Sequence, residues 1–198
     1  MVTGTRHSGL NTLNAGKPRS GTVLWLMGPT SAGKTTLATR AVEHLRESGI
    51  PAIFYDGDEI REFFGSDFGF SLQARFRVVS VLAHLANKAA EAGLNVIVAA
   101  VTAGQDARDY VRDNVRNLKI GYISCSIGTC AQRDPKGLYR KAINGEIDTL
   151  IGYNGEYRAP DSPDLILDTE SYSVDELVSR IVAQYVPRQP TADMTRSI

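Results

Sequence analysis

"GPTSAGKTT", residues 28–36, follows the apolar run "TVLWLM" (22–27) and precedes a segment of helical periodicity near 34–48. It matches the pattern G-x-x-x-x-G-K-[ST], in which two glycines let the backbone curl so that successive N–H groups point at phosphate oxygens. The positive end of the following helix dipole adds to this attraction. Because a strand before the loop and a helix after it are the context that the motif requires, the stretch predicts a binding loop for a nucleoside triphosphate.

Residue types within this loop indicate separate roles. Lys34 is expected to reach the β- and γ-phosphates, the Thr35 hydroxyl to bind Mg²⁺, and Thr36 to bond a phosphate nearer the base. The other loop residues expected to contact the nucleotide are Gly28, Ser31, Ala32 and Gly33.

The rest of the chain alternates between strand-like and helix-like segments. The strand-like runs are continuously apolar, as in parallel strands that are covered on both faces, and they span 22–27, 52–57, 95–101, 120–127 and 164–169. Helical segments are expected near 34–48, 71–92, 105–117 and 174–185. This order predicts the α/β class: a three-layer sandwich with a mainly parallel five-stranded sheet, which with the phosphate loop indicates the P-loop NTP hydrolase/kinase fold.

Segment composition suggests how the chain is organised. Residues 1–21 are polar and rich in Gly, Ser and Asn, which predicts a flexible leader, and the tail from 187 to 198 is expected to be disordered. Residues 22–186 then form a single kinase domain. Within it, the long charged segment 133–163 is rich in Gly and Pro and predicts a mobile lid over the site.

Overall composition favours a protein of the cytoplasm that binds small molecules. The 198 residues contain 22 Lys and Arg against 22 Asp and Glu, so bulk charge points neither to nucleic acid nor to a membrane. No apolar run approaches the ~20 residues that span a bilayer. Cys125 and Cys130 lack metal-ligand spacing and are expected to be reduced thiols.

The residues after the second strand favour phosphoryl transfer over hydrolysis or switching. The chain has no N-K-x-D element for guanine, and the third strand ends in Thr102 instead of the carboxylate pair of many ATPases. The stretch "YDGDEIR" instead places Asp56, Asp58 and Arg61 where strand ends line the ligand crevice. A carboxylate there can accept a proton from an attacking hydroxyl, and an arginine can hold an anionic acceptor.

Together these residues resemble the adenylylsulfate kinase (APS kinase) family, which transfers the ATP γ-phosphoryl group to the 3′-hydroxyl of adenosine 5′-phosphosulfate (APS) and yields PAPS. The resemblance covers about residues 22–183, and its most specific parts are "GPTSAGKTT", "DGDEIR", "DFGFS", "RDPKGLYRKAINGEI" and "APDSPDLILDT". It implies ATP and Mg²⁺ as cofactors, an anionic nucleotide as acceptor, a role in sulfate assimilation, and a homodimer.

The resemblance also implies roles for individual residues. Asp58 would act at the acceptor 3′-hydroxyl as general base or metal partner, while Arg61 and Arg75 would clasp the phosphate–sulfate end. Phe70 would stack on the acceptor base. Catalysis would further involve Lys34 and the lid residue Lys136, which also touches the acceptor. The remaining contacts implied are Arg133 with ATP, and Asp56, Val101, Thr102 and Leu150 with the acceptor.

Departures from the family pattern gather on the acceptor side. Val78 stands where the family has Asn, residues 102–105 replace Ser-Pro-Tyr-Arg, and Leu150 replaces the aromatic residue that completes the base sandwich with Phe70. One aromatic face contributes about 1–3 kcal/mol to the binding of a base. Losing that face would weaken adenine binding about tenfold unless another ring replaces it.

Three functions remain open from the sequence. The first is an APS kinase with a repacked acceptor pocket, in which Tyr153 or Tyr157 supplies the missing ring. The second is a kinase for a different anionic nucleotide, such as cytidine diphosphoramidate. The third is a non-catalytic nucleotide-binding homologue, against which the intact Lys34 and Asp58 argue.

Overall fold

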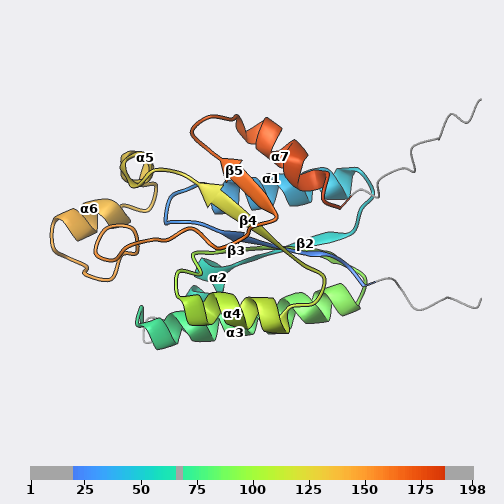
Figure 1. Ribbon diagram of the computed structural model, residues 1–198, viewed down its shortest axis with the longest axis horizontal. Coiled ribbons are helices and arrows are strands. Elements are labelled where there is room, and N and C mark those ends of the chain that lie inside the picture. The colour runs from blue at the N-terminus through green and yellow to red at the C-terminus, as the bar shows by residue number, and fades with distance from the viewer. Residues whose placement is uncertain (1–19, 66–68, 186–198) are drawn as a thin grey trace, which may run out of the picture.

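In the computed structural model, which describes residues 20–65 and 69–185, a parallel sheet lies between two helical layers (Figure 1). The sheet has the order β2-β3-β1-β4-β5, and every neighbouring pair is parallel. Its strands are β1 (Val23–Met27), β2 (Ala52–Asp56), β3 (Asn95–Ala100), β4 (Leu118–Ser124) and β5 (Leu165–Asp168). The predicted five-stranded parallel sheet is therefore confirmed. Nearly all of the predicted leader and the whole predicted tail lie outside the described residues.

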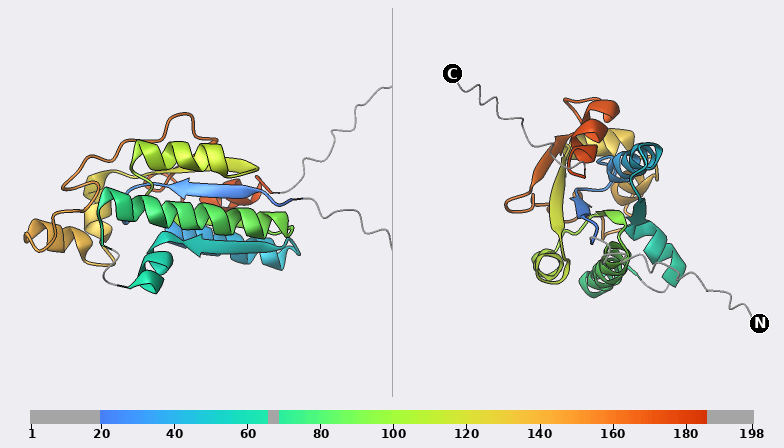
Figure 2. Two further views of the ribbon diagram at one scale, coloured as in Figure 1. Left: turned by 90° about the horizontal axis from the view of Figure 1, so that it is seen from below. Right: turned by 90° about the vertical axis from the view of Figure 1, so that its right-hand side faces the viewer.

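Two pairs of helices cover the two faces of the sheet (Figures 1 and 2). On one face lie α1 (Lys34–Glu47) and α7 (Val174–Val182), and on the other α3 (Leu72–Glu91) and α4 (Gln105–Asn114). The two faces take alternate residues of the central strand, since side chains of a strand point to opposite sides. Leu24 and Leu26 belong to the first core, whereas Val23, Trp25 and Met27 belong to the second. This arrangement confirms the predicted three-layer sandwich.

Shorter helices lie at the carboxyl ends of the strands, where the sequence predicts loops or strand. They are α2 (Gly57–Phe64), α5 (Ile127–Arg133) and α6 (Leu138–Ile143). Ser126 ends the strand expected over 120–127, because its side chain accepts a hydrogen bond from the Thr129 N–H and starts α5. The predicted lid thus contains α6 and a long return segment, which project from the sheet in Figure 1.

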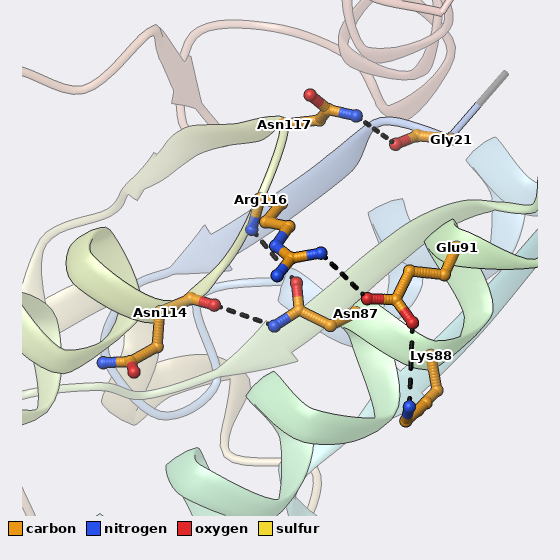
Figure 3. Close-up of polar contacts among 7 residues, drawn as sticks. All are labelled: Gly21, Asn87, Lys88, Glu91, Asn114, Arg116 and Asn117. Carbon is orange, nitrogen blue, oxygen red and sulfur yellow. Dashed lines mark hydrogen bonds and ion pairs between the residues drawn. The ribbon is translucent and has the colours of Figure 1, made fainter.

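The opposite end of the sheet carries polar contacts from α3 to the last residue of α4 and to the segment that leads into β4 (Figure 3). Arg116 forms an ion pair with Glu91 at 3.1 Å, and Asn87 donates a hydrogen bond to the carbonyl of Asn114 at 2.7 Å. Both contacts lie on the surface and far from the strand ends that carry the predicted site. They provide matched control positions for the experiments described below.

Two further expectations concern the cysteines and the membrane. Cys125 and Cys130 are buried and carry free thiols, as the sequence predicts. Within residues 20–65 and 69–185, no helix has the length and apolar character that a membrane crossing requires.

Candidate active site

A cavity of about 910 Å³ lies where the carboxyl ends of β1, β2 and β3 meet α2, the start of α3 and the predicted lid. In open parallel sheets this edge is where ligands bind. Most of the predicted site residues line it, namely Ser31, Gly33, Lys34, Thr35, Thr36, Asp56, Asp58, Arg61, Phe70, Arg75, Val101, Thr102, Arg133, Lys136 and Leu150. Gly28 and Ala32 are the predicted contacts that do not line this cavity.

The phosphate loop is shaped by its two glycines. A Cβ atom on Gly28 would lie 2.9 Å from the carbonyl oxygen of Ile123, so this glycine permits close packing of the loop against β4. Gly33 has a φ of 103°, a left-handed conformation that favours glycine, and it starts α1. Lys34 Nζ donates to the carbonyls of Gly28 at 3.0 Å and Pro29 at 2.7 Å. The ammonium group is therefore held at the mouth of the loop.

The electrostatics of Lys34 suit the binding of a polyanion. Burial lowers the pKa of Lys34 from 10.5 to about 8, although the carboxylates of Asp58 and Asp56 oppose this shift. A cation whose charged form is destabilised by desolvation gains more from an added anion than an exposed cation does. Phosphate oxygens placed beside Nζ would stabilise the ammonium form.

Thr35 and Asp56 form the polar pair that best resembles part of a binding site for a divalent metal ion. The Thr35 hydroxyl donates to Asp56 Oδ2 at 2.7 Å, while Asp56 Oδ1 accepts from the Asp58 N–H at 2.8 Å and caps α2. Hydroxyl and carboxylate oxygens are hard ligands of the kind Mg²⁺ prefers, so these residues fit the ion. In the described part of the chain no group of three or more His, Cys, Asp or Glu is placed to hold a metal ion.

Asp58 lies across the cavity in an ion pair with the lid. Its Oδ2 is 2.6 Å from Lys136 Nζ, and the side chains are 63% and 53% exposed. Burial alone would lower the pKa of Lys136, but the hydrogen bond and negative charge of Asp58 raise it overall. The charged form of Lys136 is therefore stabilised, and both side chains remain open to a ligand.

Two arginines flank the ring of Phe70. The guanidinium carbons of Arg61 and Arg75 lie 4.7 and 5.6 Å from the ring centroid. Arg75 also donates to the carbonyl of Thr149 at 2.7 Å, which links α3 to the lid. Burial lowers the pKa of both arginines, and the nearby charge of Arg61 lowers that of Arg75 further. Two adjacent partly buried cations define a site for an anion.

The cavity lining also includes apolar residues. Leu150 and Val78 line the cavity and are only 5% and 3% exposed, because each also belongs to one of the two cores. Tyr153 and Tyr157 do not line it. The ring of Tyr157 instead stacks on the ring of Tyr122 in β4, and the ring centroids lie 6.4 Å apart. In this structure neither tyrosine supplies the second aromatic face.

The sequence analysis missed two contacts near the strand ends. Thr169 follows β5, lines the cavity and accepts two hydrogen bonds from Arg133, at 2.9 Å on Oγ1 and 2.7 Å on the carbonyl. Thr169 directly follows the fifth strand, at the edge where open parallel sheets bind ligands, so its position in the sequence could have indicated a role in the site. Arg108, buried in α4, was also missed, because a charged residue in a polar helical segment suggests a solvent-exposed face.

The parallel sheet, the phosphate loop and the opposed Asp58 and Lys136 define a P-loop kinase. The model of the family described as adenylylsulphate kinase matches residues 20–168, so this chain belongs to the adenylylsulphate kinase family. The resemblance inferred from the sequence motifs is thereby confirmed.

Several relatives cover most of the chain. An adenylyl-sulfate kinase of Bacillus licheniformis is 36% identical over 84% of this chain and 85% of its own length, and a probable adenylyl-sulfate kinase of Pyrococcus abyssi is 35% identical over 82% and 93%. Among solved structures, the Mycobacterium tuberculosis APS kinase CysC in complex with AMPPNP and APS matches with a TM-score of 0.79. It is 31% identical and covers 84% of this chain and 98% of its own.

Proposed function

We propose that this protein transfers the γ-phosphoryl group of ATP to the 3′-hydroxyl of APS and so produces PAPS. The observation that carries the proposal is the pairing of Asp58 with Lys136 in the cavity that Lys34 also lines. The names of the relatives, and the APS and AMPPNP bound to the Mycobacterium tuberculosis enzyme, support this choice of substrates.

On the donor side, the chain would bind and orient the triphosphate. The loop amides and Lys34 would hold the β- and γ-phosphates, and Arg133 would contact the nucleotide from the lid. Thr35 and Asp56 would hold Mg²⁺, which, when bound, neutralises charge on the phosphate oxygens.

On the acceptor side, Asp58 would accept the proton of the 3′-hydroxyl while the oxygen of that hydroxyl attacks the γ-phosphorus. The new O–P bond forms as the bond from the γ-phosphorus to the bridging oxygen breaks, and ADP leaves with the electron pair. Lys136 would stabilise negative charge on the transferring group. Arg61 and Arg75 would hold the anionic end of APS, with its base against Phe70.

A second candidate is a different anionic nucleotide as acceptor, such as cytidine diphosphoramidate. The observation that favours it is the apolar wall of Leu150 and Val78, which gives the base one aromatic face instead of two. The two candidates differ in the base and in the anhydride, so a panel of acceptors separates them.

The deciding experiment measures PAPS formation by purified protein with ATP, Mg²⁺ and APS. Asp58→Asn should lower kcat by about 10²-fold or more while the Kd for ATP stays unchanged, since general-base catalysis contributes about that factor. Glu59→Gln is the matched control, because it neutralises the adjacent carboxylate on α2, which does not line the cavity. Wild-type protein that binds ATP but forms no PAPS at any APS concentration would exclude this substrate.

Two expectations of the sequence analysis remain part of this proposal. The homodimer follows only from the family resemblance, and light scattering of the purified protein would test it. The cytoplasmic location is likewise still a prediction, and fractionation of the source cells would test it.

A further inference from the structure

Arg108 is a buried cation that no carboxylate of residues 20–65 and 69–185 neutralises. It is 4% exposed, and it belongs to none of the ion pairs found in the described residues. Its guanidinium instead donates to main-chain carbonyls: Nε to Thr102 at 2.9 Å, Nη1 to Ala159 at 3.1 Å, and Nη2 to Arg158. The ring of Tyr157 lies 5.5 Å from its Cζ. Burying a charge is costly unless hydrogen bonds satisfy it, so this arrangement requires an explanation beyond packing.

The carbonyls that Arg108 binds belong to two distant parts of the chain. Thr102 lies two residues after β3 in the cavity wall, whereas residues 158 and 159 lie in the segment that returns from the lid to β5. The two segments are more than fifty residues apart in the sequence, and within the described residues no direct hydrogen bond joins them. The guanidinium is therefore the polar connection between the cavity wall and the returning end of the lid.

Thr102 is itself held firmly at this junction. Its hydroxyl accepts a hydrogen bond from Trp25 Nε1 at 3.0 Å, and its backbone has a φ of 43°. The indole N–H can only donate, so the hydroxyl proton of Thr102 remains available for a second bond toward the cavity. The position of that hydroxyl depends on the backbone of Thr102, whose carbonyl accepts a hydrogen bond from Arg108.

We propose that Arg108 is a positioning residue that couples the returning segment of the lid, residues 157–159, to the acceptor wall at Thr102. The inference rests on the proposed function for the identity of the acceptor, but the coupling itself is a property of the free protein. An arginine is suited to this role because its planar fork presents several donors in fixed directions, whereas a lysine is a single flexible point charge. Arg108→Lys therefore keeps the charge and removes the connection.

The first experiment measures amide hydrogen exchange in the free protein, without any substrate. In Arg108→Lys, the amide of Asp164, which donates to the Ile120 carbonyl at 2.8 Å directly after this segment, should exchange about tenfold faster or more, because the carbonyls that fix the segment lose their charged partner. Exchange in α1 should not change. The matched control is Arg116→Lys, which makes the same substitution in an exposed arginine paired with Glu91 (Figure 3) and should leave the Asp164 amide unaffected.

The second experiment separates positioning from a merely structural role. Arg108→Lys should raise the KM for APS about tenfold and leave the Kd for ATP within twofold, because only the acceptor wall is displaced. Equal losses for both substrates, or a lower melting temperature without faster exchange of the Asp164 amide, would overturn the proposal.

A third measurement uses the wild-type protein, so the proposal can be tested even if Arg108→Lys does not fold. APS should slow exchange both around Phe70 and at the Asp164 amide, which follows the returning segment. Protection around Phe70 alone would overturn the coupling while leaving the proposed function intact. If APS protects neither region, the proposed acceptor is wrong, and the exchange of free Arg108→Lys still tests the coupling.

Discussion

Lys34→Met should change how the free energy of unfolding depends on pH. The pKa of Lys34 is about 8 in the folded protein, where burial lowers it, against 10.5 for an exposed lysine. Between these two values the unfolded chain binds more protons than the folded one, so this residue makes stability rise with pH. The buried charge thus destabilises the fold below pH 8, and the penalty disappears as the pH rises to 10.5.

The pKa difference also gives the size of the effect. A difference of about 2.5 corresponds to about 3 kcal/mol, since each pH unit is worth about 1.4 kcal/mol. The quantity to compare is the free energy of unfolding of the wild type minus that of Lys34→Met. This difference should be constant below about pH 7.5 and should increase by about 3 kcal/mol up to about pH 10.5. The hydrogen bonds from Nζ to Gly28 and Pro29 shift the whole difference curve but not its shape.

Urea denaturation at a series of pH values measures this difference. Lys88→Met is the control, because Lys88 is 66% exposed and pairs only with Glu91, at 3.7 Å (Figure 3). Its difference curve should be nearly flat. A flat or falling curve for Lys34→Met between pH 8 and 10.5 would refute the claim that this ammonium group is desolvated in the folded protein.

Nucleotide affinity should depend on pH in the opposite direction. At pH 9 only about a tenth of the free protein carries a charged Lys34, so the apparent Kd for ATP should be about tenfold larger than at pH 7. Isothermal titration calorimetry can measure this change. In Lys34→Met the binding should be weak and nearly independent of pH over the same range.

Three further substitutions test other parts of the site. Leu150→Phe should lower the Kd for APS about tenfold, because it adds a second aromatic face for the base. If equilibrium binding shows an unchanged Kd, the base binds elsewhere. Gly28→Ala should destabilise the fold by about 1–3 kcal/mol, because the added Cβ lies 2.9 Å from the Ile123 carbonyl oxygen; an unaltered melting temperature would contradict this. Thr35→Val should weaken ATP binding measured with Mg²⁺ but not binding measured in EDTA; equal losses would argue against a metal ligand.

Local patterns predicted the donor side of the site well. The phosphate loop, the carboxylates after β2 and the order of the strands depend on residues that are close in sequence, so the motif and the alternation of elements were sufficient. Helix boundaries were less accurate, because caps decide them. The helix expected over 105–117 ends at Asn114, since Val115 is already extended.

The acceptor side depends on contacts between distant segments, which the sequence does not display. The place of Leu150 in a core, and the hydrogen bond from Arg75 to the Thr149 carbonyl, follow from where the lid returns to the sheet. The same is true of Arg108, whose partners Arg158 and Ala159 are about fifty residues away. No periodicity in α4 distinguishes an arginine that enters the interior from one that faces water.

The two oxygens of Asp56 have different tasks, one on the Thr35 hydroxyl and the other on the first turn of α2. A single side chain therefore sets the spacing between the loop that would carry the donor phosphates and the helix that presents Asp58. Asp56→Ala, which removes both oxygens, should loosen the loop and the helix from each other even if each still binds its own nucleotide.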